Sequence, residues 1–295
     1  MGIRYVLMTP ARNEEDYIEK TLQAVISQTI LPQRWIIVND GSTDRTGEIV
    51  TEYADRCSFI QLVTTDGDAL RNFGSKAKAI NFAYQQLTSL DFDYVGNLDA
   101  DISFDPQYYE QILCKLEENP RLGIAGGQRY DLKNDKFELV DAARNSVGGP
   151  IQLFRRACFE AIGGYMALPY GGIDAVAEIH ARMLGWEVQS FPKYRVYHYR
   201  ATGTANQNVW RAKFRAGIRD YTIGYHPLFE LMRAVRRTKE KPYILGALAM
   251  MIGYTSAMIR RLHRPVSNDL IAYLHSEQIT RLKRFVTKRV SSGST

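Results

Sequence analysis

Asp99 and Asp101 lie two positions apart, directly after the apolar run at residues 94–98. Carboxylates held this close repel each other unless a cation lies between them. Hard divalent ions such as Mg²⁺ and Mn²⁺ prefer oxygen ligands and also bind diphosphate oxygens. The two aspartates are therefore candidate metal ligands, although an Asp-x-Asp pair alone is more often a solvated turn or a loop cap.

Two further polar loops follow apolar runs earlier in the chain. The first, TPARNE, covers residues 9–14 after the run at residues 4–8, and the second, VNDGS, covers residues 38–42. The carboxyl ends of parallel strands lie at one edge of a sheet, and open α/β sheets bind ligands there. We expect the two loops and the aspartate pair to meet at one site, and this convergence favours ligand binding over a simple turn.

The first half of the chain alternates apolar runs with amphipathic segments. The pattern predicts four strands, at residues 4–8, 35–38, 59–63 and 94–98, and intervening helices near residues 18–26, 44–55 and 75–87. Such alternation predicts βαβ units in an α/β fold, with a mostly parallel sheet covered by helices on both faces. Later elements are less regular, with a helix at 174–184 and strands at 186–191 and 196–199.

Residues 3–200 resemble family 2 of the inverting glycosyltransferases, which have the GT-A fold with a Rossmann-like sheet. The matching segments are TPARNEE, VNDGSTDRT, LDAD, a later Gly-Gly loop and a helix that ends in a Gly-aromatic pair. The resemblance implies transfer of a sugar from a nucleotide-sugar, with UDP-sugars favoured, and Mg²⁺ or Mn²⁺ as the cofactor. It implies a catalytic domain at residues 1–204, with a nucleotide-sugar half near 1–101 and an acceptor half near 102–204.

The resemblance also assigns a donor-binding set. Asp40 takes the position that binds the nucleotide base in the family, and a carboxylate can accept the imide N–H of uracil. Lys76 matches a basic position in the family segment, whereas Ser75 replaces its glycine; a solvated helix start is the alternative. The complete implied set is Thr9, Pro10, Ala11, Asn13, Glu14, Asp40, Lys76 and Asp99.

The resemblance implies three metal ligands: Asp101, Asp99 and His198, the last where many GT-A enzymes carry a ligating histidine. A lone histidine among aromatic residues also fits a packed core position. Gly148 and Gly149 resemble the acceptor-side glycine loop, where a missing side chain lets a sugar approach the backbone.

A catalytic carboxylate is expected at the start of the helix near residue 174. GT-A enzymes usually carry x-Glu-Asp there, and this chain has Gly172-Ile173-Asp174. A carboxylate beside the acceptor hydroxyl can remove its proton as the oxygen attacks the anomeric carbon. Asp174 is the candidate base, Glu178 one helical turn later is its competitor, and a helix-capping role for Asp174 is the alternative.

The formal net charge of +6 hides an asymmetry between the two ends of the chain. Residues 205–295 hold 17 Lys and Arg against 5 Asp and Glu, which gives +12 and leaves −6 for residues 1–204. Basic amphipathic segments flank an uncharged stretch at residues 242–259, which would span about 27 Å, just short of a ~30 Å bilayer core. We expect a helical region at 205–290 that lies on an anionic membrane through residues 225–289, followed by a tail at 291–295. A helical subdomain with solvated charges is the alternative.

Composition and the remaining patterns limit the other functions. The three cysteines have no CxxC spacing and no signal peptide opens the chain, so we expect the cytoplasm and the inner face of the cell membrane. A sugar-nucleotide pyrophosphorylase would have a glycine-rich loop where residues 9–14 have no glycine. Nucleic-acid binding would need exposed aromatics among the basic residues. A non-catalytic glycan-binding protein remains an alternative because Ile173 interrupts the x-Glu-Asp pattern.

Overall fold

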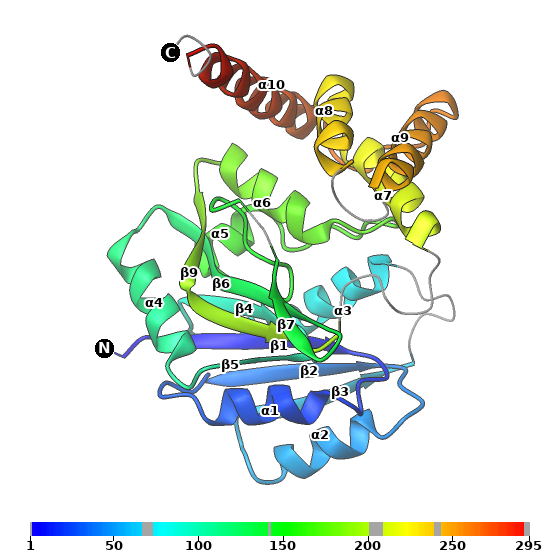
Figure 1. Cartoon of the computed structure of the whole chain (residues 1–295). Coiled ribbons are helices and arrows are strands. Elements are labelled where there is room, and N and C mark those ends of the chain that lie inside the picture. The colour runs from blue at the N-terminus through cyan, green and yellow to red at the C-terminus, as the bar shows by residue number, and fades with distance from the viewer. Residues whose placement is uncertain (1, 67–72, 141–142, 201–208, 239–242, 292–295) are drawn as a thin grey trace. The chain divides into compact units, whose positions relative to one another are not determined.

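The computed structural model describes residues 2–66, 73–140, 143–200, 209–238 and 243–291. The chain divides into two compact units (Figure 1). The sheet unit comprises Met1–Pro169 and Ile173–Thr202, and the helical unit comprises Tyr170–Gly172 and Gly203–Thr295.

Within the described residues, one nine-stranded sheet forms the sheet unit, in the order β3-β2-β1-β4-β8-β6-β9-β5 with β7 paired to β6. The first four strands pair in parallel, as the βαβ pattern predicts. The strands are β1 (Tyr5–Ala11), β2 (Arg34–Asp40), β3 (Ile60–Thr65), β4 (Tyr94–Leu98), β5 (Ile102–Phe104), β6 (Leu122–Lys133), β7 (Lys136–Leu139), β8 (Ile151–Arg155) and β9 (Glu187–His198).

The second half of the sheet is mixed rather than parallel. β8 runs antiparallel to both β4 and β6, and β5 runs antiparallel to β9. β6 and β7 form a hairpin whose turn residues, Asn134 and Asp135, both have positive φ, as a two-residue hairpin turn requires. The expectation of a mostly parallel sheet therefore holds for β1 to β4 and for the pair of β6 and β9, whereas β5, β7 and β8 run antiparallel to their neighbours.

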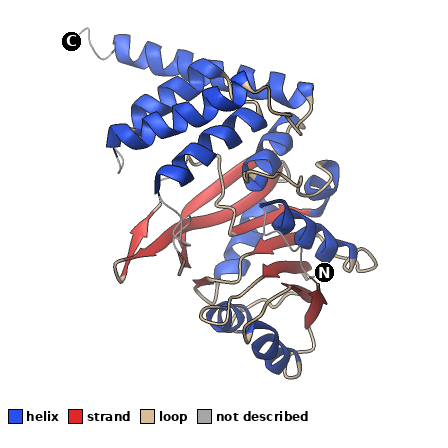
Figure 2. Ribbon diagram, turned by 90° about the vertical axis from the view of Figure 1, so that its right-hand side faces the viewer, coloured by secondary structure: helices blue, strands red, loops and turns tan. Residues whose placement is uncertain are grey.

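Helices cover both faces of this sheet (Figure 2). They are α1 (Ile18–Ile26), α2 (Thr46–Ala54), α3 (Phe73–Gln85), α4 (Tyr108–Glu118), α5 (Arg156–Ala161) and α6 (Ile173–Met183). Because β2 is covered on both sides, Trp35, Ile36, Ile37 and Val38 are all fully buried. The parallel strands β1, β2 and β4 therefore end at the same edge of the sheet, and the polar loops follow them there.

The helical unit consists of α7 (Val209–Ile223), α8 (Pro227–Arg237), α9 (Tyr243–Ile259) and α10 (Asn268–Ser291). α7 and α9 pack backbone against backbone. A Cβ on Gly217 would lie 1.9 Å from the Met250 carbonyl oxygen, and one on Gly253 would lie 2.0 Å from that of Phe214. Glycine is therefore required at both crossing points. Among the described helices, none combines the length and apolar content needed to cross a bilayer.

Candidate active site

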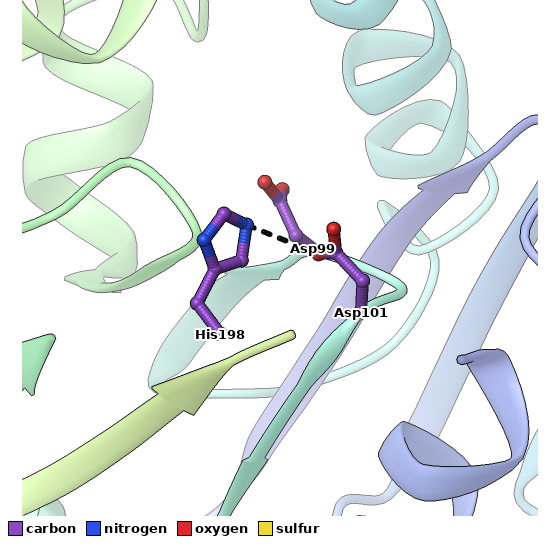
Figure 3. Close-up of side chains that lie close together, drawn as sticks. All are labelled: Asp99, Asp101 and His198. Carbon is purple, nitrogen blue, oxygen red and sulfur yellow. Dashed lines mark ion pairs between the residues drawn. The ribbon is translucent and has the colours of Figure 1, made fainter. Parts of the chain in front are cut away.

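Asp99, Asp101 and His198 point toward one another at the carboxyl edge of the sheet (Figure 3). Each offers one ligand atom, and these atoms all lie within 4.8 Å of one another. β9 pairs with β5 so that His198 stands opposite Ile102, which places the imidazole beside the aspartate pair. Its Nε2 lies 3.4 Å from Oδ1 of Asp101. The three residues named from the sequence as metal ligands therefore form one cluster.

The donor chemistry of this cluster fits a divalent ion. Two carboxylate oxygens and one imidazole nitrogen suit Mn²⁺ or Mg²⁺ and leave coordination positions for phosphate oxygens. The Nζ of Lys76 lies 2.6 and 2.8 Å from the two carboxylate oxygens of Asp99 and supplies positive charge. Burial alone would lower the pKa of His198, but hydrogen bonds to Asp101 and Asp131 outweigh it and raise the pKa to about 9.

Asp174 lies in the first turn of α6 and packs against the loop that contains Gly149. A Cβ on Gly149 would lie 2.7 Å from Oδ2 of Asp174, so the glycine makes room for this carboxylate. The Nδ2 of Asn97 donates to the Gly149 carbonyl oxygen at 2.7 Å and ties the loop to β4. Burial lowers the pKa of Lys76, but the charges of Asp99, Asp174 and Asp101 raise it overall. Asp174 thus belongs to the same electrostatic site as the aspartate pair.

Glu178 occupies a different environment on the same helix. Its Oε1 accepts hydrogen bonds from the Val147 backbone N–H at 2.6 Å and from Nε2 of Gln152 at 3.1 Å. The side chain is almost fully buried, and this burial raises its pKa to about 7. Glu178 therefore anchors the start of the loop that carries Gly148 and Gly149.

The loops after β1 and β2 are hydrogen-bonded to each other. Asn13 adopts a positive φ of 56°, and its Oδ1 accepts from the Thr43 backbone N–H at 2.9 Å. Its own N–H donates to Oγ of Ser42 at 3.1 Å, and the Glu14 N–H donates to Oγ1 of Thr46 at 2.8 Å. These bonds give the two loops one fixed geometry at the sheet edge.

The remaining donor-set residues differ in how far they reach the surface. Thr9 is fully buried and its Oγ1 accepts a hydrogen bond from Nε1 of Trp35, so its side chain belongs to the core. Ala11 is buried as well, whereas Pro10 is half-buried. Asp40 is partly exposed, and its Oδ2 lies 3.9 Å from the guanidinium of Arg12.

The model of glycosyl transferase family 2 matches residues 6–162, which is more than half of the chain. The chain belongs to glycosyl transferase family 2. It is 26% identical over 221 residues to a poly-β-1,6-N-acetyl-D-glucosamine synthase of Staphylococcus epidermidis, covering 68% of this chain and 48% of that protein. The chain thus spans about half the length of this curated relative.

Solved structures establish the GT-A fold for this family 2 chain. A mannosyltransferase from Pyrobaculum calidifontis, in complex with GDP-Man and Mn²⁺, superposes with a TM-score of 0.57 at 18% identity, covering 95% of this chain and 80% of that one. S. aureus TarS 1–349, in complex with UDP-GlcNAc, gives 0.56 at 14% identity, covering 92% and 78%. At these identities the likeness concerns the fold alone.

Three charged residues of this family 2 site were not identified from the sequence. The Oδ1 of Asp131 lies 3.0 Å from Nδ1 of His198, Arg200 forms an ion pair of 2.8 Å with Glu14, and Arg12 lies beside Asp40. Asp131 and His198 are 67 residues apart, so only the pairing of β6 with β9 brings them together. Arg200 follows His198 by two positions, which is the one sequence signal that could have drawn attention to it.

Proposed function

We propose that this chain is an inverting glycosyltransferase that uses a nucleotide-sugar, with a UDP-sugar favoured, and a divalent metal ion. The acceptor is a hydroxyl of a lipid-linked saccharide or a growing surface polysaccharide. The observation that carries the proposal is a single site that combines the cluster of Asp99, Asp101 and His198 with the carboxylate of Asp174. Family membership, a relative named as a polysaccharide synthase and a neighbour bound to UDP-GlcNAc support it.

In this reaction Asp174 removes the proton of the acceptor hydroxyl as that oxygen forms a bond to the anomeric carbon. The bond from this carbon to the nucleotide diphosphate breaks at the same time, and attack from the opposite face inverts the centre through an oxocarbenium-like state. A divalent ion held by Asp99, Asp101 and His198 would stabilise the negative charge of the departing diphosphate. Lys76, which contacts Asp99, adds positive charge at the same position.

Asp174 is proposed as the base rather than Glu178. The Asp174 side chain is partly exposed, whereas Oε1 of the buried Glu178 is already hydrogen-bonded to the Val147 backbone and to Gln152. We propose that Glu178 shapes the acceptor-side loop and that Asp40, Asn13 and Glu14 contribute to the nucleoside-binding side. Pro10 and Ala11 would contribute through their backbone.

The test is a panel of UDP-, GDP- and dTDP-sugars, assayed for hydrolysis and transfer with Mn²⁺, with Mg²⁺ and with EDTA. We expect turnover with at least one donor that EDTA abolishes. Asp174→Asn should remove transfer while preserving Mn²⁺-dependent nucleotide binding, and Glu178→Gln serves as the matched control on the same helix. No response to any donor with either metal would refute the enzymatic proposal.

We further propose that the helical unit lies on an anionic membrane surface, at the inner face of the cell membrane. α8 is the main support because it buries Glu230 and Ala234 and exposes an apolar face, with the exposed Arg236 at the edge of that face. That face consists of Leu228, Leu231, Met232 and Val235. A helix with its apolar side outward needs an apolar partner, and exposed apolar patches of this kind mark interaction sites.

α9 presents a second apolar stripe. Ile244, Leu245, Leu248, Ile252 and Ile259 are all exposed. They recur at helical spacing and so share one side of the helix. Two exposed cations, Arg260 and Arg261, directly follow this helix. Cations at the border of an apolar helical face suit insertion among anionic headgroups.

Vesicle sedimentation tests the membrane proposal. The chain should bind vesicles of phosphatidylglycerol and phosphatidylcholine more strongly than vesicles of phosphatidylcholine alone, and high salt should weaken the difference. Leu245→Ser combined with Leu248→Ser should reduce binding. Leu184→Ser, at an equally exposed leucine of the sheet unit, is the control. Equal binding by both variants would contradict the assignment of this surface.

A further inference from the structure

We propose that Asp131 is a positioning residue of the metal centre. Its carboxylate holds the imidazole of His198 so that Nε2, and not Nδ1, faces Asp99 and Asp101. This inference rests on the proposed metal-dependent transferase and adds to it a residue outside the three ligands.

The sheet register places the two side chains together. β6 and β9 run in parallel, and Asp131 stands directly beside His198 in their register. Neighbours in register on adjacent strands project to the same face of a sheet. Both residues are buried, with 5% of each exposed. Oδ1 of Asp131 lies 3.0 Å from Nδ1 of His198, while Nε2 on the other side of the ring lies 3.4 Å from Asp101.

The geometry decides which nitrogen is available to a metal ion. When Nδ1 carries a proton and donates it to a carboxylate, the lone pair of a neutral imidazole resides on Nε2. Ligating histidines commonly hold their second nitrogen in this way, and the partner fixes both ring orientation and tautomer. In this chain Nε2 is the nitrogen within the cluster of candidate ligands, so the hydrogen bond to Asp131 selects the useful tautomer.

Asp131 is itself held in place. The Nε of Arg129 lies 3.0 Å from the same Oδ1 that contacts His198. Arg129 and Asp131 are two positions apart on β6 and therefore share one face of the strand. Arg129 therefore forms an ion pair with the Asp131 carboxylate, which in turn contacts the ring of His198.

The first experiment measures Mn²⁺ affinity by isothermal titration in the presence of UDP. Asp131→Asn, which preserves shape, should weaken Mn²⁺ binding about 10–100-fold, the usual effect of losing such a partner. Glu138→Gln is the matched control, because Glu138 pairs with Asp131 across β6 and β7 but is exposed. It should leave the affinity unchanged.

A double-mutant cycle separates positioning from a general structural role. In a His198→Ala background, Asp131→Asn should cause no further loss of Mn²⁺ affinity, because the ring on which it acts is absent. An equal loss in both backgrounds, or unchanged affinity in Asp131→Asn alone, would overturn the inference. If the unsubstituted chain binds no Mn²⁺ with UDP, the metal-dependent function itself fails, and this outcome is distinct from the other two.

A measurement on the unsubstituted chain covers the case in which Asp131→Asn does not fold. In ¹⁵N NMR of the histidine side chains, added Mg²⁺ with UDP should shift the Nε2 resonance of His198 and leave its Nδ1 protonated. A shift of Nδ1 in place of Nε2 would also overturn the inference.

Discussion

The carboxylates of the two units have different charged partners. In the sheet unit, the half-buried Asp99 and the buried Asp101 face Lys76 and His198, whose contacts a ligand can replace. In the helical unit, Asp220 lies between the guanidinium groups of Arg219 and Arg233, at 2.8 and 2.9 Å. Arginine stays charged at any physiological pH. The first arrangement is suited to binding and the second to holding helices together.

The distribution of apolar side chains differs in the same way. The sheet unit buries its large apolar residues in the usual manner, around Trp35, Tyr5 and Tyr94. α8 instead buries Glu230 against Arg233 and exposes an apolar face. In the helical unit, ion pairs therefore occupy part of the interior where apolar side chains would otherwise pack. The exposed apolar side chains of this unit remain available to a partner.

Loss of the proposed base should have the largest effect. Asp174→Asn should lower the transfer rate by about 10²–10⁴-fold, the usual contribution of general base catalysis. Glu178→Gln should lower it far less, because that side chain anchors a loop. Steady-state kinetics with the active donor decide between them, and a larger loss in Glu178→Gln would reverse the assignment.

Disruption of the buried ion cluster should have the next largest effect, on stability rather than on catalysis. Asp220→Asn removes the buried carboxylate between two half-buried guanidinium groups, of which Arg233 keeps its ion pair with Glu230, and should destabilise the helical unit by about 3 kcal/mol. Urea unfolding followed by circular dichroism measures this change. Asp269→Asn, at an exposed aspartate in the first turn of α10, is the control and should cost less than about 1 kcal/mol.

Glu178 should make stability depend on pH. Its pKa is raised from 4.5 to about 7 in the folded chain, mainly by burial. The folded state therefore binds a proton that the unfolded state releases, and this stabilisation is present below pH 4.5 and lost as the pH rises through 7. It amounts to about 3 kcal/mol. The difference in unfolding free energy between the unsubstituted chain and Glu178→Gln, measured from pH 4.5 to 8, should fall by up to this amount. A difference that is constant with pH would show that Glu178 ionises normally.

The smallest effect is expected at the apolar face of α8. Val235→Ser should weaken vesicle binding by about 1.4 kcal/mol, or tenfold, because one apolar side chain no longer inserts. Arg236→Gln, at the next position, should act mainly at low salt, since it removes charge and not apolar area. If Val235→Ser leaves vesicle binding unchanged, the exposed apolar face of α8 binds a partner other than the membrane.

Local patterns in the sequence sufficed to predict the parallel half of the fold. The runs that form β1, β2 and β4 are continuous and apolar because both faces of those strands are covered, and the polar loops after them stand out against them. The mixed half was harder to predict, because β6, β7 and β8 are joined without the regular helical crossovers that mark βαβ units. Thr9 stays a predicted donor-binding residue, and in the structure its side chain is buried against Trp35.

The chain sequence by itself determined the α/β class, the position of the aspartate pair after a strand and the charge asymmetry between the two ends. Tertiary structure alone decided that Asp131 lies against His198. Their pairing depends on an irregularity where β9 advances from Phe191 to Arg195 while β6 advances only from Gly127 to Gln128. A slip of one residue turns every later side chain to the opposite face of the sheet. Such a register depends on contacts between distant segments, which no local pattern of residues records.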